Sequence, residues 1–79
     1  MRVIKETVRN DIRISLFSWN NKYIIKFEQG GVEQTFKVDE TEIAAEKDLD
    51  SLFEGEFFES VKKRFHEMQK TLRNSLENI

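Results

Sequence analysis

The chain has 79 residues, of which 38% are hydrophobic and 35% are charged, and it contains neither cysteine nor proline. This length allows one small domain, and a domain of this size buries only about 60% of the surface that its unfolded chain exposes. Cysteine is absent, which excludes disulfides, and the single histidine is too few for a zinc site. Self-association is the remaining common way to stabilise so small a core.

The composition also excludes disordered and membrane-spanning classes. Aromatic residues make up 11% of the chain, which is more than disordered chains usually contain. Apolar runs are no longer than that at Tyr23-Ile24-Ile25, so no segment is predicted to span a membrane, and the N-terminus lacks the apolar region of a secretory signal. We expect a soluble, cytoplasmic protein.

The net charge of −2 combines three zones of different sign. Residues 1–38 carry seven basic and four acidic side chains, and residues 61–79 carry five basic and two acidic ones. Residues 39–60 carry nine acidic side chains and one basic side chain, Lys47. Acidic residues favour the first turns of helices, where they oppose the macrodipole. This interpretation is preferred over a dedicated site for basic partners or cations.

Two turn signals, Asn20-Asn21 and Gly30-Gly31, predict consecutive β-hairpins. Both dipeptides tolerate the positive φ of a type I′ turn. Two-residue loops would place Leu16 opposite Ile25 and Ile25 opposite Phe36. One face of the sheet then collects the apolar side chains, which are Ile12, Ile14, Leu16, Tyr23, Ile25, Phe27, Phe36 and Val38.

Residues 2–8 predict a further strand that turns at Asn10-Asp11. A two-residue loop would place Ile4 opposite Phe17, on the face away from the core. A three-residue loop would reverse the faces and bury Glu6. The two-residue loop is preferred, and the sheet is expected to have three or four strands.

Helical signals follow Val38. Asp39 and Glu42, three residues later, predict a short helical segment that Asp39 caps and that runs to Glu46 or Lys47. Ser51 and Glu54 then match a capping box before the main helix, and Gly55 would mark the true start of that helix or a bend. Apolar residues recur at helical spacing, namely Phe57/Phe58, Val61, Phe65, Met68, Leu72, Leu76 and Ile79.

Together these elements predict an α+β domain over residues 1–79. Antiparallel strands occupy 1–38, an acidic connection with a short helical turn occupies 39–51, and one long amphipathic C-terminal helix over 52–77 packs on one face of the meander. The centre of the core is predicted to contain Phe27, Ile25, Phe36, Phe65 and Val61.

No pattern in the sequence indicates catalysis. There is no cysteine nucleophile and no glycine-rich phosphate loop, and the serines lack the strand–turn–helix setting of a nucleophile elbow. The only imidazole, His66, is expected to be exposed on the flank of the helix. We therefore expect a non-enzymatic protein that uses no cofactor and no small-molecule substrate.

Residues 48–59 resemble a calcium loop in their acid spacing. However, Leu52 stands at the fifth position, where an oxygen ligand belongs, and Phe53 stands at the sixth, which requires glycine. No metal site is predicted.

The outer face of the predicted sheet presents Arg13, Phe17, Trp19, Lys22, Ile24, Lys26, Thr35 and Lys37. Three interpretations stay open for this face. Phe17, Trp19 and Ile24 can form a dimer or protein-partner interface, which is preferred; the face can be simply solvated; or it can bind single-stranded nucleic acid, with aromatic rings stacking on bases and cations tracking phosphates. The nucleic-acid face would comprise Arg13, Phe17, Trp19, Lys22, Lys26 and Lys37.

A second candidate interface follows from a length mismatch. From Phe57 to Ile79 the helix rises roughly 33 Å, whereas strands of about seven residues span roughly 23 Å. The apolar stripe nevertheless continues through Leu72, Leu76 and Ile79. We therefore expect a small interaction module that self-associates as a homodimer, with single-stranded nucleic-acid binding as the alternative.

An antiparallel meander that ends in one long amphipathic helix resembles the PUR-type repeat and the PC4/Whirly-type single-strand binders. In those families the sheet binds nucleic acid, and dimers or paired repeats complete the domain, so the resemblance implies the same arrangement here. It covers the whole chain as architecture and matches no residue motif, so it implies no site residues. In size the chain is also similar to small conserved bacterial proteins of unassigned function.

Overall fold

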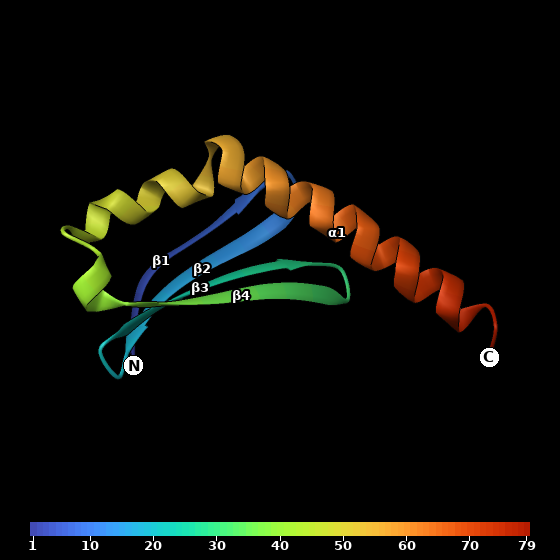
Figure 1. Ribbon diagram of the computed structural model, residues 1–79, viewed down its shortest axis with the longest axis horizontal. Helices are drawn as coiled ribbons and strands as arrows, with labels where there is room; N and C mark the ends of the chain where they lie inside the picture. The colour runs from blue at the N-terminus through green and yellow to red at the C-terminus, as the bar shows by residue number, and fades with distance from the viewer.

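The computed structural model describes residues 1–79 and consists of a four-stranded antiparallel sheet with helices on one face (Figure 1). The strands pair in chain order and are β1 (Arg2–Arg9), β2 (Ile12–Trp19), β3 (Lys22–Gln29) and β4 (Val32–Asp39). Two 3-10 helices, η1 (Glu40–Glu42) and η2 (Glu46–Phe53), precede the helix α1 (Gly55–Leu76). The predicted α+β meander followed by a long helix is confirmed.

Two-residue turns join each strand to the next. The first two turns have positive φ at both central residues, which are Asn10, Asp11, Asn20 and Asn21, as type I′ requires. In the third turn only Gly30 has a positive φ, at +59°. This is the pattern of a type II′ turn, so the prediction of type I′ at Gly30-Gly31 is wrong.

The register of both predicted hairpins is confirmed. Leu16 pairs with Ile25, and Ile25 pairs with Phe36. The side-chain period of a strand is two residues, so a slip of one residue would have moved every apolar side chain to the other face. The predicted apolar set therefore faces the helices.

The pairing of β1 differs from the prediction in one respect. The loop has two residues, but a bulge between Val3 and Lys5 shifts the register, so that Val3 and not Ile4 lies opposite Phe17. Ile4 instead packs, half-buried, against the core. The extra residue of a bulge also bends an edge strand and disturbs its ladder.

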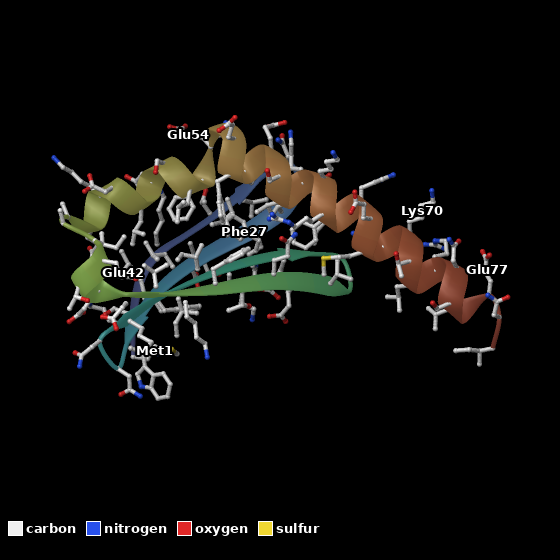
Figure 2. All side chains as sticks on the ribbon, in the orientation of Figure 1. Met1, Phe27, Glu42, Glu54, Lys70 and Glu77 are labelled. Carbon is white, nitrogen blue, oxygen red and sulfur yellow. The ribbon has the colours of Figure 1, made fainter.

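The core lies between the sheet and the helices. Its buried members are Ile12, Ile14, Leu16, Ile25, Phe27, Leu49, Phe53, Phe58, Val61 and Phe65. The ring of Phe27 is 6.0 Å from that of Phe57 and 6.4 Å from that of Phe58, measured between centroids, and Figure 2 shows Phe27 between the two layers. Phe36 was predicted to be central, but it is only half-buried because β4 is an edge strand.

The helical half begins differently from the prediction. Asp39 caps a helical segment, and its carboxylate accepts a hydrogen bond of 3.2 Å from the backbone N–H of Thr41, but this segment ends at Glu42. The main helix starts at Gly55, with a φ of +74°, and not at residue 52. None of the helices combines the length and the apolar composition needed to cross a bilayer.

The predicted capping box does not form. The hydroxyl of Ser51 donates to the backbone carbonyl oxygen of Asp48 inside η2, and Glu54 makes no side-chain hydrogen bond to the start of α1. The residues between Glu46 and Phe53 follow the tighter 3-10 path, which turns Leu49 and Phe53 into the core.

Candidate interaction surfaces

The C-terminal part of α1 carries an apolar stripe that no other element covers. Gln69 ties the helix to the β3–β4 turn, because its Nε2 atom donates to the backbone oxygen of Gln29 at 3.4 Å. The remaining residues, 70–79, are called the overhang here, and Figure 1 shows the helix continuing past the turn. Leu72 is 46% exposed, Leu76 is 57% exposed and Ile79 is 98% exposed. All three predicted interface residues are thus accessible, but α1 ends at Leu76, so Ile79 lies outside the helix and the prediction that the helical stripe reaches it is wrong.

Two hollows flank this end of the helix. One, of about 490 Å³, lies between the overhang and the β3–β4 turn and includes Val32, Leu72 and Leu76. The other, of about 660 Å³, includes Val32, Gln34, Met68 and Leu72 but no residue of β3. Since β4 is the last strand of the sheet, the second hollow opens on its free side.

Gln34 is the buried polar side chain among those that line the second hollow. It is buried, and its Nε2 atom donates a hydrogen bond of 3.0 Å to the backbone oxygen of Val61. Its Oε1 atom is buried without a partner. This side chain joins β4 to α1 on the inner face of the sheet.

The outward edge of β4 has free backbone groups. β4 pairs only with β3, and Gln29 and Val32, which flank the two-residue turn, form the first hydrogen-bonded pair. Hydrogen-bonded and non-hydrogen-bonded pairs alternate along an antiparallel ladder. The N–H and C=O groups of Glu33, Thr35 and Lys37 therefore point away from β3.

The other edge strand, β1, is tied to the helices. Three ion pairs join them, which are Arg2–Glu46 at 2.7 Å, Lys5–Asp50 at 3.4 Å and Arg9–Glu54 at 3.8 Å. Three of the acidic side chains in residues 39–60 thus form ion pairs within the chain. This favours the structural interpretation of that zone over a site for basic partners.

The outer face of the sheet has an apolar row and one pocket. Val3, Phe17 and Ile24 lie side by side across three strands. Trp19 is 53% exposed and shares a pocket of about 210 Å³ with Ile24, Lys22 and Lys37. The predicted outer-face interface residues are therefore neighbours, but they lie on the face opposite α1 and its overhang.

Acidic side chains accompany most of the predicted basic residues on this face. Lys26 Nζ lies 3.7 Å from Glu28 and 3.9 Å from Glu33, Arg13 lies opposite Glu28, and Lys22 lies opposite Asp39. The outer face is thus charge-balanced, and not a basic surface of the kind that phosphate backbones attract.

The remaining polar residues do not assemble into a recognisable centre. His66 is exposed on α1. Residues 48–59 form most of η2 and the first turn of α1 and not a loop, and no group of three or more His, Cys, Asp or Glu side chains is placed to hold a metal ion.

No family model, curated protein or solved structure matches this chain. The resemblance to PUR-type and PC4/Whirly-type modules therefore stays a prediction.

Proposed function

We propose that this protein is a non-enzymatic interaction module that self-associates as a homodimer, in which the second copy covers the apolar stripe of the overhang. The observation that carries this proposal is the exposure of Leu72 and Leu76 in helical phase with the buried Val61 and Phe65. A helix end without a partner would be expected to become polar on all sides where the sheet stops. One stray apolar residue is common at a frayed end, whereas this stripe is continuous.

The size of the core supports the same conclusion. Only 12 of the 79 residues are buried, and small single cores rarely supply more than about 3–5 kcal/mol of stability. Covering more apolar surface by association raises that stability, because a partner that binds only the folded chain shifts the folding equilibrium. Two-fold pairing is the commonest closed solution.

The overhang alone is a modest interface. Fully burying one leucine side chain stabilises by about 1.5–3 kcal/mol. Leu72 and Leu76 are already roughly half covered, so burying both in each of two copies gains on the order of 3–6 kcal/mol. Association itself costs about 4–15 kcal/mol. A stable dimer therefore needs a further contact besides these leucines.

Sedimentation of the wild-type chain and of two double variants tests the proposal. The wild type should sediment at micromolar concentration with a mass near twice 9.4 kDa. Leu72→Glu with Leu76→Glu should shift the mass toward the monomer while the circular dichroism spectrum is kept, because both side chains are exposed in the single chain.

The matched control is Lys70→Glu with Asn74→Glu. These residues have the same spacing on the helix but line neither hollow, and Lys70 points away from the sheet (Figure 2). The control should remain dimeric although it changes the net charge by more. A wild-type chain that stays monomeric, or a control that dissociates equally, would contradict the proposal.

The Trp19 pocket favours one alternative, namely single-stranded nucleic-acid binding on the outer face. An exposed indole beside Lys22 and Lys37 can stack on a base while the ammonium groups contact phosphates. Trp19 is the only tryptophan, so its fluorescence reports on this pocket directly. Quenching by mixed-sequence single strands that weakens steeply with salt would make this alternative the better one, and unchanged fluorescence at low salt would exclude it.

A further inference from the structure

We propose that the two copies join through antiparallel pairing of their β4 strands centred on Thr35, which merges the two sheets into one continuous sheet. This inference rests on the proposed self-association and names the contact that orders the copies. The groups that would pair are already free, because Glu33, Thr35 and Lys37 direct their N–H and C=O groups away from β3. The occupant of this edge is thus a second copy of the same chain.

The charged side chains of β4 favour one register of this pairing. Only residues with outward-pointing backbone groups can form hydrogen-bonded pairs with each other, so allowed registers differ by two residues. With Thr35 opposite Thr35 of the second copy, Glu33 faces Lys37 and Lys37 faces Glu33. Opposite charges directly across two strands stabilise the pair, and like charges destabilise it.

The neighbouring registers lack this complementarity. A shift in one direction places Glu33 opposite Asp39 of the second copy, which sets two carboxylates against each other. A shift in the other direction places Glu33 opposite Thr35 and Lys37 opposite Gly31, which leaves every charge without a counterpart. Charged residues on an edge strand usually prevent pairing, but here their order around Thr35 is self-complementary and favours a single register.

The burial of side chains on the inner face of β4 also supports pairing with a second copy. Val32, Phe36 and Val38 face the helices but are only half-buried, whereas Ile25, beside Phe36 on β3, is fully buried. The apolar core is therefore only partly covered at the free edge of β4. In the Thr35-centred register Val32 would face Val38 of the second copy, and the adjoining strand would cover these partly exposed side chains.

The same pairing brings the two helical layers together. Directly opposite residues in an antiparallel pair project to the same face of the sheet, so both copies carry their helices on one side. The second copy would then approach the hollow that opens on the free side of β4, lined by Val32, Met68 and Leu72. One contact therefore supplies backbone hydrogen bonds and covers part of the exposed stripe of α1.

The opposite edge of the sheet is less suited to this role. A bulge interrupts the β1 ladder between Val3 and Lys5, and bulges disrupt edge-to-edge pairing. β4 has no such irregularity in its pairing with β3. Since the chain offers two sheet edges, this difference assigns the contact to β4.

Cysteine cross-linking tests the pairing. The chain contains no cysteine, so Thr35→Cys introduces a unique thiol at the two-fold centre. Opposite residues of a hydrogen-bonded pair have Cα atoms about 5.5 Å apart, which a disulfide can span. Under mild oxidation Thr35→Cys should form a covalent dimer at least roughly tenfold faster than a matched control. That control is Glu6→Cys, at the β1 end of the same cross-strand row.

Charge reversal gives an independent readout. Glu33→Lys alone and Lys37→Glu alone each turn two attractive contacts into repulsive ones, and each should weaken the dimer roughly tenfold. The combined variant restores opposite charges with their order exchanged, and it should recover dimer affinity close to that of the wild type. Both single variants lie on the exposed side of an edge strand, so they should fold.

The outcomes separate the two proposals. A wild-type chain that is monomeric overturns self-association and β4 pairing together. A dimeric wild type in which Thr35→Cys cross-links no faster than Glu6→Cys keeps self-association and overturns β4 pairing. So does a combined charge-reversal variant that dimerises as weakly as the single ones.

Discussion

The side-chain amide of Gln34 donates a hydrogen bond of 3.0 Å to the backbone carbonyl oxygen of Val61 and so joins the edge strand β4 to α1. The other amide atom, Oε1, is buried and unpaired. A buried polar atom without a partner costs about 1–3 kcal/mol, which offsets the roughly 0.5–1.5 kcal/mol that one net hydrogen bond contributes. Gln34 therefore positions the helix over β4 more than it stabilises the fold.

Two substitutions at Gln34 should have different effects. Gln34→Leu should change the free energy of unfolding by no more than about 1 kcal/mol, because it removes the hydrogen bond and the unpaired oxygen together. Gln34→Glu should destabilise the protein, and increasingly so as the pH rises. Burial raises the pKa of the new carboxyl above its unfolded value of about 4.3, so the folded state resists its ionisation. Urea unfolding at about pH 4 and about pH 7 measures this, and a pH-independent loss would contradict it.

Phe65 and its neighbour His66 test the phase of α1. Phe65 is fully buried, so Phe65→Ala should cost about 3–5 kcal/mol, which is enough to unfold a domain of this size. His66→Ala, one residue later on the exposed side, should leave the melting temperature nearly unchanged. Thermal melts followed by circular dichroism compare the two, and equal effects would mean that the helix is wrongly phased.

The two glycines of the β3–β4 turn should respond in opposite ways to alanine. Gly30 has a positive φ of +59°, and a residue with a Cβ held in such a sparsely populated conformation costs on the order of 1–3 kcal/mol. Gly31 does not share it, and a Cβ there would meet nothing within 4 Å. Gly30→Ala should therefore lower the stability by about 1–3 kcal/mol, whereas Gly31→Ala should be neutral or slightly stabilising, since it restricts the unfolded chain. The denaturant midpoints of the two variants, compared with that of the wild type, measure both changes in stability.

Asp39 should titrate abnormally. Hydrogen bonds from the backbone and the hydroxyl of Thr41, helped by the charge of Lys22, lower the pKa of its carboxyl below the ordinary value of 3.8. A lowered folded-state pKa means that the contribution to stability is present above pH 3.8 and is lost as the pH falls through the lowered value. Carboxyl chemical shifts followed by NMR should show this, and Thr41→Val should move the pKa of Asp39 partly back. An unchanged pKa in that variant would exclude the hydroxyl as a cause.

Much of the sheet could be predicted because its turns are short. Two-residue loops at Asn20-Asn21 and Gly30-Gly31 leave one register that keeps all apolar side chains on one face. The bulge in β1 could not be predicted in this way. Val3 and Ile4 are both apolar, so either of them opposite Phe17 satisfies the pattern, and only three-dimensional packing selects Val3.

The start of the helical half was harder to predict. Ser51 and Glu54 have capping-box spacing, but the 3-10 path of η2 directs the hydroxyl of Ser51 to Asp48 instead. Leu49 and Phe53 are buried in the core but were missed, because they stand among acidic residues in the sequence. The overhang was predictable from element lengths, and the edge position of β4 was implied by the predicted meander.

Amide hydrogen exchange of the wild-type chain at nanomolar and high micromolar concentration tests most directly whether a second copy covers the overhang. If it does, the amides of residues 70–76 should exchange more slowly at the higher concentration, and so should those of Glu33, Thr35 and Lys37 on the free edge of β4. The backbone amides of β1, on the opposite edge of the sheet, provide the internal control and should not change. Exchange rates along residues 70–76 that are the same at both concentrations would contradict the account.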